Sequence, residues 1–249
     1  MSDYLYGRHA VLEALRARRE VEEILIARGV DTRGALNQVM TLARQAGVPV
    51  RELPRADLDR LAQRHQGILA RVREFEYADL EELLAVAPAR GEPAFLLMLD
   101  SVQDPQNLGT LLRTAEAVGV QGVIFAERRA AGVTPAVAKA SAGAVEHLKI
   151  ARVTNLARTI EQVKRENIWV VGVENVPQAG DLFQADLTMP LMLVLGSEGA
   201  GLGRLVESKC DLLVRLPMWG RIESLNVAVA GSIALYVVKT QRVAILTKH

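Results

Sequence analysis

Six short runs rich in aliphatic residues, most of them continuous and without polar alternation, constrain the fold of this chain more than any other feature. A strand with one face in water alternates apolar and polar residues, whereas a parallel strand covered on both faces is apolar throughout. Segments with helical spacing fall between the runs, so the sequence predicts an α/β layer structure with a parallel sheet. The expected strands span residues 95–100, 122–126, 148–153, 168–173, 191–196 and 212–216. The expected helices span residues 106–118, 135–142, 155–165, 202–209 and 226–242.

The preceding part of the chain predicts a separate, smaller α/β domain. Its expected helices and strands span residues 8–18, 23–27, 32–46, 48–52, 55–64 and 68–72. From residue 74 the sequence becomes rich in charge and ends with Pro88 and Pro93, which is typical of a linker, with one short helix at 79–85. We therefore expect an N-terminal domain over residues 1–73, a linker over 74–93 and a C-terminal domain over 94–249.

Composition restricts the class of protein. Half of the residues are hydrophobic and 24% are charged, which excludes a disordered chain. The longest weakly interrupted apolar run, residues 225–238, contains Asn226 and Ser232 and is shorter than the roughly 18 residues of a membrane span. A secretory signal pattern is absent from the N-terminus, and the single cysteine, Cys210, permits neither an internal disulfide nor a cysteine-based metal cluster. We expect a soluble, cytoplasmic protein without a metal.

The charge distribution bears on a nucleic-acid partner. The net charge of +1, taken as one number, argues against such a partner. Residues 1–75, however, hold 13 arginines and 10 acidic residues, and no lysine precedes Lys139. Arginine presents a planar fork that suits phosphate oxygens, although a GC-rich genome also favours arginine, and 24 of the 30 basic residues are arginine. The ten aromatic residues are too few to favour RNA recognition by a sheet of stacking aromatics.

Three segments follow expected strand ends, where open parallel sheets usually bind ligands. In the first segment, residues 100–113, Asp104 and Pro105 signal a helix start, and Asn107 and Arg113 lie six residues apart on that helix. Six residues rotate by about 600°, so Arg113 is expected about 120° from Asn107 around the helix axis. By itself the segment also fits an ordinary helix with a solvated arginine.

The second segment, residues 193–203, runs from an apolar strand into a turn with four glycines in eight residues. Such a turn brings backbone amides close to a ligand. It is not a P-loop, because Leu202 and Gly203 stand where Lys and Ser or Thr are required, and it also departs from the GxGxxG pattern. The carboxylate of Glu198 would repel phosphate. The segment therefore predicts a ligand site that is neither a phosphate nor a dinucleotide site.

The third segment, residues 216–234, leads from a strand into a long helix. Pro217 ends the strand, Ser224 is expected to cap the helix, and Asn226 lies in its first turn. Small residues between Ala228 and Ser232 let another backbone approach closely. This pattern fits contact with a second subunit and an alanine-rich core helix equally well.

In this order and spacing, the three segments resemble the signature motifs of the SpoU (TrmH) family of RNA ribose 2′-O-methyltransferases, within the SPOUT superfamily. The resemblance covers residues 95–242, where Asn-x-Gly-x-x-x-Arg, Leu-Gly-Ser-Glu-Gly and Pro-Met-x-Gly-x-x-x-Ser-Leu-Asn-Val all recur. Residues 6–15 and 65–67 further resemble the small substrate-binding domain of the bacterial subgroup that methylates a large-subunit rRNA guanosine. That domain has a fold also seen in RNA-binding ribosomal proteins. Gln106 departs from the pattern, because much of the family has His there.

The resemblance implies a fold that periodicity cannot show, a parallel sheet whose C-terminal stretch is threaded into a deep trefoil knot. It also implies that S-adenosylmethionine is the cofactor and is bound in the knot loops. The positive sulfonium of this cofactor suits a glycine-rich loop that contains a carboxylate. The implied cofactor-binding residues are Leu195, Gly196, Gly199, Leu216, Leu225 and Asn226.

The implied reaction is an in-line attack of a ribose 2′-hydroxyl on the methyl carbon, in which the protein mainly positions groups and removes a proton. The resemblance implies that Asn107 and Arg113 contact the reacting nucleotide. It implies that Glu198 and Ser224 organise the site and that Asn226 bonds near the cofactor or the ribose. The family's arginine is often described as the general base, but guanidinium groups, with a pKa above about 12, are not deprotonated in ordinary protein settings. We hypothesise that Arg113 holds the adjacent phosphate and stabilises the developing alkoxide.

The resemblance therefore predicts a two-domain, homodimeric enzyme that methylates a ribose, most simply that of a guanosine, in 23S rRNA. Alternatives within the family are a tRNA ribose methyltransferase and an antibiotic-resistance rRNA methyltransferase. The N-terminal domain favours rRNA, because the tRNA enzymes of the family commonly carry short terminal extensions instead. The alternative of another class is an RNA-binding ribosome assembly factor without catalysis, against which the intact motif residues argue.

Overall fold

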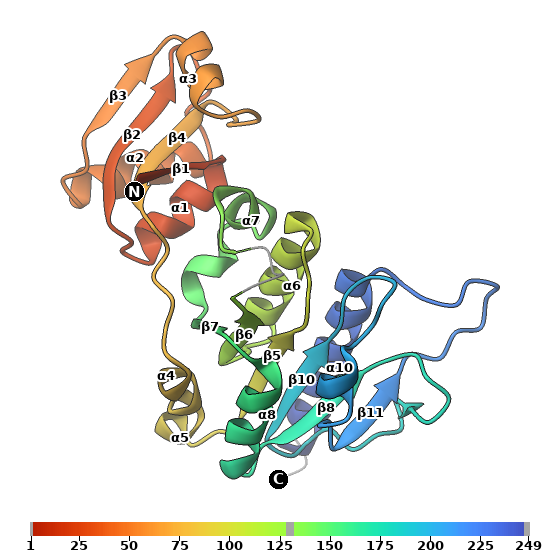
Figure 1. Ribbon diagram of the computed structural model, residues 1–249. Coiled ribbons are helices and arrows are strands. Elements are labelled where there is room, and N and C mark those ends of the chain that lie inside the picture. Colours follow the sequence, from red (N-terminus) through yellow and green to blue (C-terminus); the bar gives the residue numbers. More distant parts are fainter. Residues whose placement is uncertain (1, 128–131, 247–249) are drawn as a thin grey trace. The chain divides into compact units, whose positions relative to one another are not determined.

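The computed structural model describes residues 2–127 and 132–246, which divide into two compact units (Figure 1). Unit 1 combines the residues up to Glu76 with the segment Gly132–His147. Unit 2 contains the other described residues, from Tyr77 to residue 127 and from Leu148 onward. Each unit is therefore built from separate stretches of the chain.

A four-stranded mixed sheet and its helices form the main part of unit 1. In chain order the elements are β1 (Ser2–Tyr6), α1 (Arg8–Arg16), β2 (Val21–Ala27), α2 (Ala35–Gln45), β3 (Val50–Leu53), α3 (Arg55–Leu61) and β4 (Ile68–Arg73). The strand order is β1-β4-β2-β3, with β2 parallel to β3 and β4 antiparallel to β1 and β2. The predicted helices and strands of this region are present. Strand β1 is missing from the prediction, because its partner β4 lies at the other end of the domain sequence.

The segment Gly132–His147 packs with unit 1, although the sequence leads us to expect it in the C-terminal domain. It contains α7 (Pro135–Ala140) and the 3₁₀ helix η1 (Ala144–His147). Val137 and Val145 are fully buried. Glu146, with a side chain only 3% exposed, pairs with Arg19 at 2.7 Å. Burial raises the pKa of Glu146, and the nearby charge of Arg19 acts in the opposite direction. Apolar packing and this buried ion pair thus hold the segment on unit 1.

Parallel strands form the sheet of unit 2, as the aliphatic runs predict. They are β5 (Phe95–Leu99), β6 (Gly122–Ala126), β7 (Ile150–Val153), β8 (Trp169–Val173), β9 (Gly180–Asp181), β10 (Leu191–Leu195) and β11 (Leu212–Arg215). Their order is β7-β6-β5-β10-β8-β11-β9, and every residue of the central strands β5 and β10 is buried. The predicted α/β fold with a parallel sheet is confirmed, and the two-residue strand β9 is an addition to it.

The helices of unit 2 include two that lie within the predicted linker. The helices are α4 (Leu80–Leu84), α5 (Val86–Arg90), α6 (Pro105–Ala117), α8 (Leu156–Arg165), α9 (Arg204–Glu207) and α10 (Val227–Leu246). Leu80 and Leu83 of α4 and Ala87 of α5 are buried in the same apolar cluster as Leu96 and Ile124. Most of the predicted linker therefore belongs to the core of unit 2, because its apolar residues form helical faces that cover the sheet.

Asn226, and not Ser224, caps the C-terminal helix α10. The backbone N–H groups of Ala228 and Val229 donate to Asn226 Oδ1 at 2.9 and 3.3 Å. The predicted cap at Ser224 is therefore wrong, because the helix begins at Val227. Asn226 therefore caps α10 through Oδ1, while its Nδ2 bonds to Asn107 in the site described below.

Helix α10 is apolar but only partly covered. Within the described residues it is the one helix long and apolar enough to cross a membrane, with 19 residues of mean hydropathy 1.2, and 28% of that stretch is buried. Core helices of soluble proteins have the same character. Its covered face is close-packed, since a Cβ at Gly231 would lie 2.4 Å from a methyl carbon of Leu195 and 2.6 Å from one of Leu111. Much apolar surface on its other face remains exposed.

Candidate active site

The carboxyl ends of four neighbouring strands meet at one edge of the unit 2 sheet. Asp100 follows β5, Glu174 follows β8, Gly196 follows β10 and Leu216 follows β11. In space these strands are ordered β5-β10-β8-β11, so chain order and spatial order differ. Open parallel sheets form ligand-binding crevices at such points. The three motifs predicted from the sequence therefore converge at this edge.

The glycine-rich turn after β10 folds into a tight hairpin. Ser197 and Gly201 exchange backbone hydrogen bonds of 3.0 and 3.1 Å. Gly199 and Gly201 have φ angles of 78° and 65°, a conformation that favours glycine. At Gly196 a Cβ would lie 2.2 Å from the carbonyl carbon of Gly201. Gly199 and Gly201 therefore allow the chain to turn, and Gly196 allows the two arms of the hairpin to touch.

Two carboxylates from neighbouring strand ends hold the exit of this hairpin. The backbone N–H of Leu202 donates to Glu174 Oε2 at 2.7 Å, and that of Gly203 donates to Asp100 Oδ2 at 2.8 Å. Hydrogen bonds to charged acceptors are about twice as strong as those between neutral groups. Sequence reasoning missed both residues as site residues. One feature of the sequence could have identified Asp100 and Glu174, since each is a carboxylate that directly follows an apolar run.

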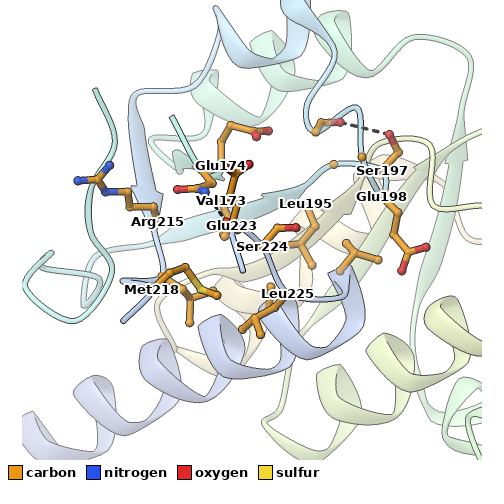
Figure 2. Close-up of a pocket in the computed structure, with 17 residues that line it drawn as sticks. Val173, Glu174, Leu195, Ser197, Glu198, Arg215, Met218, Glu223, Ser224 and Leu225 are labelled. Carbon is orange, nitrogen blue, oxygen red and sulfur yellow. Dashed lines mark hydrogen bonds between the residues drawn. The ribbon is translucent and has the colours of Figure 1, made fainter. Parts of the chain in front are cut away.

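A cavity of about 300 Å³ lies beside the hairpin (Figure 2). The side-chain amide of Asn175 donates to the carbonyl of Glu223 at 2.7 Å and ties the loop before α10 to the end of β8. Five of the predicted cofactor-binding residues line the cavity, namely Leu195, Gly196, Gly199, Leu216 and Leu225. Asn226 is not part of its lining. The remaining lining residues include Glu174, Ser197, Glu198, Arg215, Met218, Glu223 and Ser224.

Asn107, Glu198 and Asn226, one residue from each motif, form a hydrogen-bonded group. Asn107 Nδ2 donates to Glu198 Oε1 at 2.9 Å, and Asn226 Nδ2 donates to Asn107 Oδ1 at 3.0 Å and to the same Glu198 oxygen. The α10 cap occupies Asn226 Oδ1 and so sets the orientation of this amide. A second cavity of about 380 Å³, lined in part by Asn107 and Asp104, shares Ser197, Glu198 and Val227 with the first. The three motifs therefore meet where two cavities join.

The other two predicted catalytic residues lie apart from this group. Ser224 lines the first cavity. Arg113 is exposed on α6 and is not part of the lining of either cavity. Its position six residues after Asn107 explains this, because it points to another side of the helix. The hydroxyl of the next residue, Thr114, hydrogen-bonds to that of Ser232 on α10 at 2.9 Å, so Arg113 lies near the contact between α6 and α10.

The charges around the first cavity suit a ligand with a positive group. Its lining holds three carboxylates, Glu174, Glu198 and Glu223, and one guanidinium, that of Arg215. In Figure 2, Arg215 and Glu198 lie at opposite ends of the cavity. Among the described residues, no group of three or more His, Cys, Asp or Glu side chains could hold a metal ion. Burial raises the pKa of Cys210 to about 12, so its thiol is not a nucleophile at neutral pH.

Known proteins share the two-part organisation of this chain. The SpoU rRNA Methylase family profile matches residues 94–236. A second profile, described as RNA 2′-O ribose methyltransferase substrate binding, matches residues 4–78. YacO of Bacillus subtilis (strain 168), a protein assigned to the TrmH family of tRNA/rRNA methyltransferases, is 45% identical over 241 residues, which are 96% of each chain. Both parts of this chain therefore have relatives among RNA methyltransferases.

Solved structures extend the similarity to the cofactor. The SpoU methyltransferase AviRb from Streptomyces viridochromogenes, in complex with AdoMet, matches with a TM-score of 0.81 and 26% identity over 98% of this chain and 91% of AviRb. The AdoMet-bound rRNA methyltransferase from Sinorhizobium meliloti matches with a TM-score of 0.75 and 25% identity over 96% and 87%. The A. aeolicus TrmH/SpoU tRNA modifying enzyme matches with a TM-score of 0.56 and 26% identity over 67% and 83%. The chain thus belongs to the SpoU (TrmH) family of RNA methyltransferases and uses S-adenosylmethionine as its methyl donor.

Proposed function

We propose that this enzyme methylates the ribose 2′-hydroxyl of a guanosine in 23S rRNA, in the cytoplasm. The observation that carries the proposal is the group Asn107–Glu198–Asn226 at the junction of two cavities, one of which fits the cofactor. The extent of the structural matches favours rRNA. The tRNA modifying enzyme covers 67% of this chain, whereas the S. meliloti rRNA methyltransferase covers 96%. A tRNA methyltransferase and an antibiotic-resistance rRNA methyltransferase are the alternatives within the family.

The first cavity fits S-adenosylmethionine by size and charge. Its volume of about 300 Å³ lies at the lower end of the range of small-ligand sites. Its carboxylates suit the positive sulfonium, and the contact between Gly196 and Gly201 keeps the hairpin beside the cavity closed. The bound cofactor supplies an electrophilic methyl group. We assign its binding to the backbone at Gly196, Leu216 and Leu225.

The second cavity is assigned to the reacting nucleotide. Asn107 lines it, and Glu198 lies between it and the cofactor cavity. Two amide donors orient the Glu198 carboxylate, so it costs little reorganisation during the reaction. We assign to Asn107 and Asn226 the positioning of the ribose and to Ser224 the organisation of the cofactor side. Arg113 is assigned to the phosphate next to the reacting ribose.

The trefoil knot is part of the proposal. In the sheet, β8 lies between β10 and β11. After β11 the chain crosses back, and Asn226, just before α10, bonds to Asn107 of α6. Between β11 and α10 the chain lines the same cavity as the hairpin that follows β10. Asn175, just after β8, donates a hydrogen bond to the carbonyl of Glu223 in this stretch. This path supports a threaded arrangement, of a kind that is rare in proteins. A knot would hold the three cofactor-binding segments together.

The exposed face of α10 supports a homodimer. Val229, Tyr236 and Val243 lie seven residues apart and are 48%, 52% and 45% exposed. Seven-residue spacing aligns side chains along one face of a helix, and a second copy of the chain would cover this stripe. Because Arg113 lies near the same helix, a dimer would also bring the partner subunit close to this exposed arginine.

The Tyr236→Glu variant is expected to be monomeric, because it places a charge in the middle of the proposed interface. Light scattering after size exclusion should give twice the chain mass of 27.1 kDa for the wild type and the single mass for the variant. Phe183→Glu is the matched control, because Phe183 is 47% exposed and lies outside α10. A wild-type protein that is monomeric at working concentration would rule out the proposed dimer.

Glu174→Ala is expected to weaken binding of S-adenosylmethionine about 10-fold, because the hairpin loses a charge-assisted hydrogen bond at Leu202. Glu174→Gln keeps an acceptor and should lose less. Calorimetric titration with S-adenosylmethionine measures both effects. Glu166→Ala, at an exposed position after α8, is the control and should bind like the wild type. Equal affinities for all the variants would show that Glu174 does not support the hairpin.

The methyl acceptor is tested with labelled S-adenosylmethionine and separate pools of rRNA and tRNA, followed by mapping of ribose methylation. We expect label in 23S rRNA at one guanosine ribose. Label in tRNA alone would replace the proposed substrate. Absence of label from the rRNA pool would overturn the proposed substrate, and it would favour a role in ribosome assembly only if the tRNA pool also stayed unlabelled.

A further inference from the structure

A strained loop connects α3 to β4 in unit 1. Helix α3 ends at Leu61, three residues before the end that the sequence predicts, and the chain then takes an unusual path. Arg64 and Gln66 both have a φ of 57°, and Gly67 has a φ of 84°. Residues other than glycine rarely adopt this conformation, and strained positions of this kind are concentrated at functional sites. The loop Arg64–Gly67, called the 64–67 loop below, therefore needs specific support.

A buried histidine supplies that support. His65 is 1% exposed, and its Nδ1 accepts a 3.0 Å hydrogen bond from the N–H of Gly67. Its other nitrogen, Nε2, therefore carries the proton and donates to Asp59 Oδ1 at 2.9 Å. A Cβ at Gly67 would lie 2.6 Å from a methyl carbon of Val30. Hydrogen bonds at both ring nitrogens and the close packing of Gly67 therefore support the unusual backbone of the 64–67 loop.

Cations from three parts of the chain gather at this loop. The Lys139 ammonium, on α7, donates to the carbonyl of Arg64 and lies 5.1 Å from the ring centroid of Tyr6. The backbone N–H of Arg8 donates to Gln66 Oε1 at 3.2 Å, and its guanidinium Nε donates to the Gln66 carbonyl at 3.5 Å. The 64–67 loop therefore brings together three basic side chains, from α1, the loop itself and α7.

These cations differ from most other basic residues of unit 1 in having no carboxylate partner. Ion pairs occupy Arg16, Arg19, Arg33, Arg51, Arg60, Arg71 and Arg73. Across residues 2–127 and 132–246, no carboxylate lies within ion-pair distance of Arg8, Arg64 or Lys139. The nearby carboxylate of Asp59 accepts a hydrogen bond from His65, and that of Asp31 pairs with Arg33. The cluster thus keeps its positive charge available for an external anion.

We propose that the 64–67 loop, together with Arg8 and Lys139, binds a phosphodiester of the RNA substrate. This proposal depends on the proposed function in one respect, namely that the ligand is RNA. Residues 4–78 match the substrate-binding profile, but Lys139 lies in the part of the chain that matches the methylase profile. The substrate-binding site would therefore be completed by α7, which packs on unit 1 with the segment Gly132–His147.

The electrostatics of Lys139 agree with a site for an anion. Burial lowers the pKa of Lys139, and the positive charge of Arg64 lowers it further. A bound phosphate would offset both effects, because it attracts the two cations at once. The guanidinium forks of Arg8 and Arg64 suit phosphate oxygens, and the Lys139 ammonium adds a compact charge at the same loop.

Arg64→Gly is the sharpest test, because it removes the charge and also suits the backbone conformation at this position. Binding is measured by fluorescence anisotropy with a fluorescein-labelled RNA hairpin of arbitrary sequence at several salt concentrations. We expect Kd to rise about 10-fold and the slope of log Kd against log salt concentration to fall by about 1. Lys139→Gln should give a similar loss. Unchanged thermal unfolding would show that both variants are folded.

Arg18→Gly is the matched control. Arg18 is also exposed, with a φ of 59°, and it lies just beyond the other end of α1 from Arg8. It should bind the hairpin like the wild type. Wild-type affinity and salt dependence in both Arg64→Gly and Lys139→Gln would overturn the proposal. If Arg64→Gly weakens hairpin binding while the wild type methylates no RNA, the phosphate site stands and the proposed function fails.

Discussion

Replacement of Gly196 by alanine is expected to weaken binding of S-adenosylmethionine by about 100-fold, to the point where methyl transfer is lost. The added Cβ would lie 2.2 Å from the carbonyl carbon of Gly201, 2.3 Å from its oxygen and 2.5 Å from the nitrogen of Leu202. All three are backbone atoms, so no side chain can move aside. The hairpin must open, and with it the wall of the cavity that we assign to the cofactor. Calorimetric titration with S-adenosylmethionine measures the loss.

Alanine substitutions at two other glycines distinguish the effect of the atomic contact at Gly196 from the effect of backbone strain. Gly220→Ala, in the loop before α10, meets no atom within 4 Å and should bind the cofactor like the wild type. Gly199→Ala also meets no atom, but the φ of 78° at this position makes an intermediate loss the expected result. Suppose that Gly196→Ala binds S-adenosylmethionine with wild-type affinity and unfolds at the wild-type temperature. The hairpin closed by the Ser197–Gly201 hydrogen bonds would then not be required for cofactor binding.

The parallel sheet of unit 2 could be predicted because burial on both faces leaves a direct trace in the sequence. Strands β5 and β10 are apolar at every position and fully buried. The glycine-rich turn predicts a ligand site for a different reason, since four glycines in eight residues are more than a tight turn requires. The assignment of Leu195 and Gly196 to the cofactor, by contrast, depends on the resemblance to the family, and both residues line the first cavity.

The support of the site could not be predicted, because it depends on strand order. Asp100 and Glu174 hold consecutive amides of one hairpin, yet each follows a different strand and neither belongs to the glycine-rich segment. Strand order brings them together, and no local pattern encodes it. The placement of Glu146 beside Arg19 is likewise non-local, because that ion pair joins residues 127 positions apart.

Arg113 differs from Asp100 and Glu174, because a sequence motif identifies it as a functional residue although it lines neither cavity of the single chain. Asn107 and Arg113 belong to one motif, but Asn107 bonds to Glu198 while Arg113 is exposed on another side of α6. The apolar stripe of α10, around Tyr236, is exposed on the neighbouring helix. Both features have a single explanation in the proposed dimer, which would cover the stripe and bring a partner subunit near Arg113.

Replacement of Arg113 by lysine is expected to lower kcat about 100-fold, a loss typical of one removed transition-state donor. Lysine keeps the charge but loses the planar fork that grips a phosphate, so the alkoxide is less well stabilised. Binding of S-adenosylmethionine should not change, because Arg113 does not line the cofactor cavity. Steady-state methyl transfer with the labelled cofactor at saturating RNA measures kcat, and Arg165→Lys, at an exposed position on α8, is the control.

The pH dependence of Arg113→Lys distinguishes the two roles of this residue. If the guanidinium holds the phosphate while the proton leaves by another route, the variant keeps the wild-type shape of the pH–rate profile at a lower level. If the side chain at this position removes the proton, an amine can do so once it is neutral, because lysine loses its proton far more readily than arginine. The rate of the variant would then rise with the titration of the lysine, and the phosphate-holding role would be wrong.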